Sequence, residues 1–271
     1  MMITYHDVAS ALKQLGLDRS IPVIAHISME RLGEVKGGAD TLVGALLAAV
    51  DNAIMPVFTF ATMVVPESGP EDNDITYGSG RDSNLHAAIF ENSLPSDMPD
   101  CQAAEVFRAY PGSFRSSHPI LSFTGLGLDA ALHAQSLENP YAPIQALMDL
   151  NGWVVLMGAE PSANFSLHYA EKLVGRKQFT RWALTPAGVA ACPFFPGCPN
   201  GFHKIHYYLQ DELKRTLVED QEWVAVSLKT LIQTARQLMQ EDALALLCND
   251  LNCPRCNLVR QAVRAQFRAR Q

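Results

Sequence analysis

A histidine and a carboxylate lie three positions apart in the segment Asn164-Phe165-Ser166-Leu167-His168-Tyr169-Ala170-Glu171. On a helix, His168 and Glu171 would share one face and could touch. Glu171 could then accept the Nδ1 hydrogen of His168, fix the tautomer of the ring and leave Nε2 free to take a proton. Such a pair could act as a general base. The same spacing also occurs by chance, in ordinary pairs at the surface or at the edge of the core.

A second polar stretch runs from Arg115 to Gly127 and contains serines and a histidine around a proline, in Arg115-Ser116-Ser117-His118-Pro119. The residue before a proline is held extended, so the stretch could form a loop that lines a cleft. A turn followed by a strand, with His118 as a cap, fits equally well.

Five of the six cysteines lie in the last third of the chain. Cys248, Cys253 and Cys256 form a compact knuckle that ends in Cys-Pro-x-Cys. A tetrahedral zinc site needs a fourth ligand, which Cys198 or Cys192 could supply. Such a zinc would be structural and would staple the region 191–256 together. Free thiols are the alternative, because a reducing compartment requires no metal at these cysteines.

The elements that must position these groups alternate between strands and helices. We predict strands at 22–27, 53–58, 153–159 and 222–227, loops at 28–38 and 191–201, and helices at 4–16, 39–50, 101–110, 129–137, 141–150, 165–174, 203–217 and 228–240. Continuous apolar character at 153–159 is typical of a strand covered on both faces. Open α/β sheets bind ligands at the carboxyl ends of their strands, and the segment that holds His168 begins there. We therefore expect an α/β fold in a single large domain (1–271), with a mixed central sheet covered by helices on both faces and a Cys-rich C-terminal segment.

Two segments depart from this alternation. Residues 61–100 contain several carboxylates among Gly, Pro, Ser and Asn, and an irregular segment of that length is usually functional or mobile. At the end of the chain, residues 257–271 are predicted to form a basic helical tail. Its arginines Arg260, Arg264 and Arg268 lie opposite Leu258, Val259, Val263 and Phe267.

The bulk composition limits the partners. The chain has 271 residues, of which 48% are hydrophobic, and a formal net charge of −7. This charge makes the body of the protein a poor partner for nucleic acid. No apolar run approaches the roughly 18 residues that a membrane helix needs, and the N-terminus lacks the features of a signal peptide. We expect a cytoplasmic protein that binds neither membrane nor nucleic acid, and the sequence leaves its oligomeric state open.

The order and spacing of four blocks resemble the aminoglycoside 3-N-acetyltransferase family, whose members transfer an acetyl group from acetyl-coenzyme A to an amine. The blocks are Ser28 to Gly38, Met55-Pro56-Val57-Phe58-Thr59, the segment from Ala104 through His118-Pro119 to Phe123, and the segment from Asp149-Leu150-Asn151-Gly152-Trp153 to Glu171. The resemblance covers about residues 5–175. It implies an acyltransferase of the antibiotic-resistance type, with acetyl-coenzyme A as co-substrate and a small amine as acceptor.

The resemblance also implies residue roles. His168 would be the general base and Glu171 its orienting partner, with Thr59 and His118 beside the reacting centre. The residues implied to hold coenzyme A are Ser28, Leu32, Gly33, Val35, Lys36, Gly37, Gly38, Ser117, Ser122 and Phe123. The composition of the 28–38 loop suits this role, since glycines allow close backbone approach and N–H groups with a lysine suit phosphate. The loop has neither a Walker A nor a G-x-G-x-x-G pattern.

Some features leave the acceptor open. Val57 replaces an expected threonine, and residues 61–100 match the family poorly. Pockets for polycationic aminoglycosides are acidic, and this segment offers Glu67, Glu71, Asp72 and Asp74. Another antibiotic or a biosynthetic amine fits equally well. Two rival functions are an inactive, zinc-stapled binding protein of the same fold and a metal-dependent hydrolase using His168, Glu171 and His118.

Overall fold

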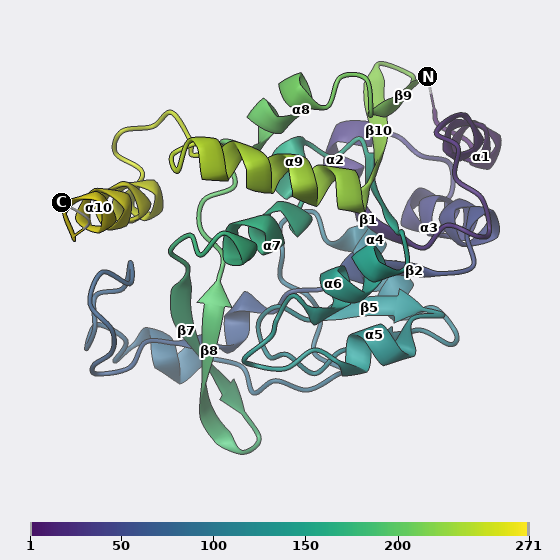
Figure 1. Ribbon diagram of the computed structural model, residues 1–271. Coiled ribbons are helices and arrows are strands. Elements are labelled where there is room, and N and C mark those ends of the chain that lie inside the picture. The colour runs from purple at the N-terminus through teal and green to yellow at the C-terminus, as the bar shows by residue number, and fades with distance from the viewer. Residues whose placement is uncertain (1, 270–271) are drawn as a thin grey trace.

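The computed structural model describes residues 2–269, which build a seven-stranded mixed sheet with helices on both faces (Figure 1). The strand order is β4-β5-β2-β1-β6-β10-β9. The strands are β1 (Val23–Ile27), β2 (Ala53–Pro56), β4 (Phe114–Arg115), β5 (Phe123–Leu126), β6 (Trp153–Met157), β9 (Lys214–Val218) and β10 (Gln221–Ser227). Strands β2, β1 and β6 are parallel, whereas β5 and β10 flank them in the antiparallel sense. The predicted α/β fold with a mixed central sheet is confirmed.

Strands β1 and β6 lie in the middle of the sheet because their side chains enter two apolar cores on alternate sides. Ile24 and Val154 belong to one core, and Ala25 and Val155 belong to the other. The first core is covered by α5 (Asp129–His133), α6 (Ala142–Asp149), α7 (Ser166–Leu173) and α9 (Leu228–Glu241). The second is covered by α1 (Tyr5–Gln14), α3 (Gly38–Ala49) and α4 (Gln102–Arg108). The apolar runs predicted as buried strands are therefore confirmed.

A smaller sheet of order β3-β7-β8 combines β3 (Met63–Val64) with a hairpin of β7 (Phe179–Thr185) and β8 (Gly188–Phe195). No sequence pattern indicated this hairpin, and the loop predicted at 191–201 is wrong in its first half. Prolines argued against a strand there. Pro193 is tolerated because β8 is at the edge of the sheet and its register with β7 is irregular at this point.

The helix predicted at 203–217 is wrong. The chain forms η4 (Phe202–Lys204) and α8 (Ile205–Tyr208) and then the strand β9. Ile205, Leu209 and Leu213 have helical spacing and are all buried, which explains the prediction. Pairing of β9 with β10 across a tight turn outweighs that local pattern.

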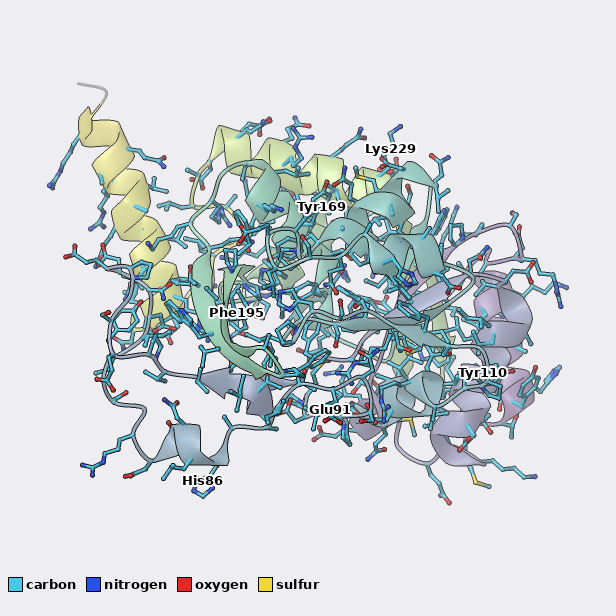
Figure 2. All side chains as sticks on the ribbon, turned by 90° about the horizontal axis from the view of Figure 1, so that it is seen from below. His86, Glu91, Tyr110, Tyr169, Phe195 and Lys229 are labelled. Atoms are coloured by element: carbon cyan, nitrogen blue, oxygen red, sulfur yellow. The ribbon has the colours of Figure 1, made fainter. Side chains whose placement is uncertain are left out.

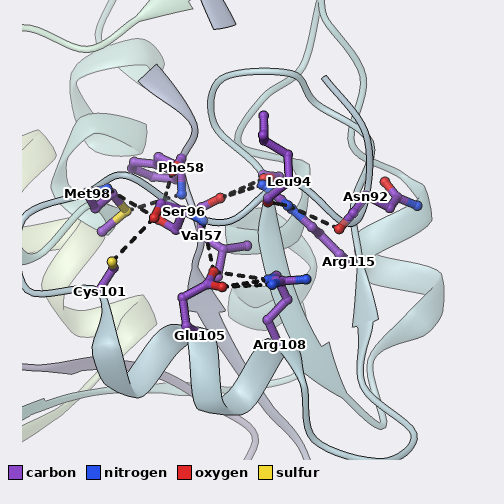
Figure 3. Close-up of polar contacts among 11 residues, drawn as sticks. Val57, Phe58, Asn92, Leu94, Ser96, Met98, Cys101, Glu105, Arg108 and Arg115 are labelled. Carbon is purple, nitrogen blue, oxygen red and sulfur yellow. Dashed lines mark hydrogen bonds and ion pairs between the residues drawn. The ribbon is translucent and has the colours of Figure 1, made fainter. Parts of the chain in front are cut away.

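The segment 61–100 is largely irregular, as predicted, with β3 and the short η2 (Ser83–His86) as regular parts, and η1 (Phe60–Thr62) at its start. Buried hydrogen bonds attach it to the sheet. The Arg115 guanidinium donates to the carbonyls of Val57 (3.0 Å), Asn92 (3.2 Å) and Leu94 (Figure 3). Within residues 2–269, no helix is long and apolar enough to cross a membrane.

Helix α10 (Pro254–Ala269) lies at one end of the molecule, away from the large sheet (Figure 1). Val259 on this helix is buried, whereas Arg264 and Arg268 are exposed. Residues 270–271 of the predicted basic tail lie outside the described residues.

Candidate active site

A cavity of about 550 Å³ opens at the carboxyl ends of β1 and β6. One part of its wall is formed by the end of β1 and the residues after it, including His26 and Ser28. Another part follows β6 and includes Ala159 and Phe165, together with His168 on α7. The surface of the cavity is mostly apolar. The predicted position of the site, beyond the end of β6, therefore coincides with a cavity large enough for a small ligand.

His168 and Glu171 form a buried hydrogen-bonded pair on α7. Nδ1 of His168 lies 2.7 Å from Oε2 of Glu171, and both side chains are 4% exposed. The other carboxylate oxygen of Glu171, Oε1, accepts a hydrogen bond of 3.0 Å from Arg176. Burial alone would raise the pKa of Glu171, but the hydrogen bond to His168 and the charge of Arg176 outweigh it and lower that pKa. The carboxylate is therefore ionised at neutral pH.

The ionised Glu171 determines the tautomer of His168. A carboxylate can only accept, so Nδ1 is the donor in this contact, and in the neutral form of the ring Nε2 would carry the lone pair. The rings of Phe165 and Phe202 pack on the imidazole, with centroid distances of 5.5 and 4.7 Å, and hold its plane. The imidazole thus has a fixed orientation at the wall of the cavity.

Thr59 and His118 are buried behind the cavity. The Thr59 hydroxyl donates to the carbonyl of Pro119 at 2.7 Å. Nδ1 of His118 accepts the backbone N–H groups of Ile120 (3.1 Å) and Leu121 (3.0 Å). Burial lowers the pKa of His118 to about 4. Neither Thr59 nor His118 is in the described lining of the cavity. Leu121, whose N–H group bonds to His118, does line it.

The 28–38 loop reaches the cavity at its beginning. Ser28, which lines the cavity, caps α2 (Met29–Leu32) and donates to the carboxylate of Asp100 at 2.6 Å. That carboxylate also accepts the N–H groups of Met29 (3.0 Å) and Glu30 (3.3 Å), so these donors already have a partner. The remaining residues proposed for coenzyme A, namely Leu32, Gly33, Val35, Lys36, Gly37 and Gly38, follow Arg31 in the chain and are not among the described residues that line the cavity.

The three other residues implied to face coenzyme A have different surroundings. Ser117 is exposed. The Ser122 hydroxyl donates to the carbonyl of Val57 (2.9 Å) and accepts from Arg115 (3.0 Å), while Phe123 is part of the buried core. None of the three belongs to the described lining of the cavity.

The cavity includes a histidine that the sequence did not single out. His26 is 7% exposed, and burial lowers its pKa to about 3, so the ring is neutral. Its Nε2 is buried without a hydrogen-bond partner. The only signal in the sequence was its position near the carboxyl end of the first predicted strand. Cys101, the N-cap residue just before α4, also lines the cavity, and its Sγ lies 3.4 Å from the carbonyl oxygen of Ser96.

The acidic residues of the cavity differ from those predicted. Glu67, Glu71, Asp72 and Asp74 are not among its described lining, and Asp74 is paired with Arg255 (2.9 Å) and Arg181 (3.6 Å). The acidic residues in the lining are Glu30, Asp100 and Glu160.

Four cysteines from two distant parts of the chain come together. The Sγ atoms of Cys198, Cys248, Cys253 and Cys256 lie within 4.8 Å of one another. Cys192, the alternative fourth ligand, is instead buried in the large core. This is the only group of three or more potential metal ligands found among the described residues.

The structure therefore combines an α/β fold with a buried imidazole–carboxylate pair at a cavity beyond the ends of its parallel strands. Residues 24–240 match the profile of the aminoglycoside 3-N-acetyltransferase family, which is most of the 271 residues. The chain belongs to this family.

Individual relatives agree with this assignment. Aminoglycoside N(3)-acetyltransferase VII of Streptomyces paromomycinus is 31% identical over 178 residues, covering 63% of this chain and 61% of the relative. Aminoglycoside N(3)-acetyltransferase IX of Micromonospora chalcea is 30% identical over 193 residues, covering 66% of each. The matches thus span just under two thirds of these relatives. The crystal structure of aminoglycoside acetyltransferase AAC(3)-IVa has the same fold, with a TM-score of 0.77 at 21% identity over 97% of this chain and 98% of that chain.

Proposed function

We propose that the protein is a cytoplasmic acetyl-coenzyme A-dependent N-acetyltransferase in which His168 is the general base. The observation that carries this proposal is the buried His168–Glu171 pair at the wall of the cavity. Two solved neighbours support it: AAC-IIIb is described in a binary complex with CoASH, and an AAC(3)-IVa mutant in complex with a gentamicin.

The reaction asks little of the protein, because a thioester carbonyl is already activated. The acceptor nitrogen attacks the carbonyl carbon while Nε2 of His168 takes one of its protons. The C–S bond then breaks, and the imidazolium returns the proton to the leaving sulfur. Glu171 stabilises the imidazolium and does not itself take the proton. A positioned base contributes roughly 10²–10⁴-fold, and holding amine and thioester together contributes further.

The cavity accommodates both reactants in this proposal. Its apolar surface suits the pantetheine arm, with Ser28 and the loop after it on the coenzyme side. Thr59 and His118 act indirectly, because their bonds to the 119–121 backbone hold the segment that presents Leu121 to the cavity. The acceptor is an aminoglycoside-type antibiotic or another small amine. Glu30, Asp100 and Glu160 supply negative charge to its pocket, with Glu160 paired to Arg31 in the same lining.

The hydrolase alternative receives less support from the contacts. Both oxygens of Glu171 have partners in His168 and Arg176, and Nδ1 of His118 is occupied by two backbone N–H groups. These three side chains are not arranged as a ligand set.

Thiol release from acetyl-coenzyme A, measured against a panel of aminoglycosides and other amines, tests the proposal. His168→Ala should lower kcat/KM by about 10²–10⁴-fold, while the Kd for coenzyme A stays nearly unchanged. Glu171→Gln should retain part of the activity, since its amide oxygen can still accept from Nδ1. His6→Ala, on the exposed face of α1, is the matched control. Thiol release by His168→Ala within about threefold of wild type, a factor far below the range for a base, contradicts the role of His168.

The cysteine cluster is proposed as a structural zinc site. Four thiolates at a Zn–S distance of about 2.3 Å form a tetrahedron with S···S separations of about 3.8 Å. The four Sγ atoms, all within 4.8 Å of one another, can close on such an ion with small movements. Metal analysis should give one zinc per chain in wild type and in Cys192→Ser. Cys256→Ser should lose it, and an equal metal content in both variants contradicts the site.

A further inference from the structure

Two segments that carry the clustered cysteines also form part of the cavity wall. Phe195, Pro196, Gly197, Pro199 and Asn200 line the cavity and flank Cys198. Arg255, which lies between Cys253 and Cys256, lines the same cavity. The side chains that would hold a metal and those that face a ligand are thus neighbours in the chain.

The cysteines themselves pack only in a small apolar cluster, whereas Phe195 and Leu246 beside them are buried in the first core. The four cysteines share a small cluster with Leu247, Val259 and Val263, separate from the two large cores. Hydrogen bonds also connect the region after Cys198 to the region around Cys248. The Lys204 ammonium group donates to the carbonyl of Leu247 and to Oδ1 of Asn249, both at 2.7 Å.

Arg255 connects the cluster to the wall through its side chain. Its Nε donates to Asp74 at 2.9 Å, and its guanidinium lies over the ring of Phe195 at 5.4 Å. Figure 2 shows Phe195 close to the beginning of α10, where Arg255 lies. Arg181 packs on the same ring at 5.0 Å and also pairs with Asp74. Arg255, whose position the knuckle sets, is thus one of the groups that pack on Phe195.

We propose that Zn²⁺ bound by Cys198, Cys248, Cys253 and Cys256 holds this wall of the cavity, so that metal occupancy controls how tightly the cavity binds its ligands. The direct route from the metal to the ligand runs through segment 195–200 and Arg255, which line the cavity. His168 and Glu171 are linked to the cysteine region only through a further residue each, Phe202 and Arg176. Loss of the metal therefore raises the KM for the acceptor, the Kd for coenzyme A, or both, by a larger factor than it lowers kcat. Because coupling between two sites is reciprocal, coenzyme A that binds more tightly to the zinc form must also retain zinc by the same factor. The inference rests on the proposed function only for its turnover readout.

The test compares the full chain with and without zinc. Removal by a chelator should weaken ligand binding by about 5- to 100-fold, the usual range of coupling between two sites, and added zinc should restore it. Circular dichroism checks that the zinc-free chain stays folded. Arg255→Met, which keeps all four cysteines, should reproduce the weaker binding with zinc still present. Arg264→Met, an exposed position on the same helix, is its control.

The outcomes separate the two proposals. Ligand constants that change by less than twofold on zinc removal and in Arg255→Met overturn the coupling, as does a fall in kcat alone. Absence of turnover with every amine overturns the proposed function. Even then, two measurements without turnover still test the coupling. They are the Kd of coenzyme A with and without zinc, and the rate of zinc loss to the chelator with and without coenzyme A.

Discussion

Lowering the pH from 7 to 5 should destabilise the fold through two buried histidines. Burial lowers the pKa of His26 to about 3 and that of His118 to about 4, from the ordinary value of 6.5. The unfolded chain therefore binds protons that the folded protein excludes. The stability that depends on these neutral rings is complete above pH 6.5 and is lost as the pH falls below that value.

The size of the effect follows from these shifts. At pH 5, about 1.5 units below the ordinary histidine pKa, each ring costs about 2 kcal/mol, so the two together remove about 4 kcal/mol. That is a large part of a typical stability of about 5–15 kcal/mol. His206, whose pKa is lowered by burial and by Arg215, acts in the same direction. The lowered pKa values of Glu105 and Glu171 matter only below their ordinary value of 4.5 and leave this range unaffected.

Urea unfolding at pH 7, 6 and 5, followed by tryptophan fluorescence, measures the effect. His118→Asn keeps an acceptor for the backbone N–H groups, and His26→Leu removes a ring nitrogen that has no partner. Each variant should lose about half of the pH dependence, since each ring supplies about half. His6→Gln, at an exposed position, should keep all of it. Wild-type stability that is equal at pH 5 and pH 7, or an unchanged slope in both variants, would refute the reasoning.

Four further substitutions have defined outcomes. Arg176→Gln, which leaves the buried Glu171 carboxylate without its cation, should lower the free energy of unfolding by about 3–5 kcal/mol in urea titrations. Arg115→Met leaves the carbonyls of Asn92 and Leu94 without their donor, while Val57 keeps its bond from Ser122, and should cost about 3 kcal/mol, with faster proteolysis of segment 61–100. A methyl group at Gly201 would collide with the backbone of Leu246 and Leu247, so Gly201→Ala should destabilise the fold and lower its metal content. Gly44 is in an open position on α3, and Gly44→Ala should stabilise the fold by about 0.5–1 kcal/mol in the same titrations.

The parts of the fold that local patterns determine were predictable. The central strands β1 and β6 read as continuous apolar runs because helices cover both of their faces. The contact between His168 and Glu171 follows from helical spacing, and the structure contains that contact. The cysteine knuckle likewise indicated which side chains would meet.

The rest depends on contacts between distant segments. Nothing near the 28–38 loop indicates that Asp100 occupies the N–H groups of Met29 and Glu30. The cavity lining joins His26 from the first strand to Arg255 near the end of the chain, a juxtaposition that only tertiary packing creates. Strand β9 was mistaken for part of a helix because its pairing partner, not its own periodicity, determines its conformation.

The salt bridge beneath the imidazole has a consequence for shortened versions of the chain. Arg176, the counterion of Glu171, is itself anchored by the carbonyls of Ala243 (2.9 Å) and Ala245 (2.7 Å). These two acceptors follow residue 240, where the family match ends. Deletion of everything after α9 would keep every residue of the matched region and still release the guanidinium that steadies the Glu171 carboxylate. A fragment chosen by sequence similarity alone would therefore contain the whole dyad but lack its anchor.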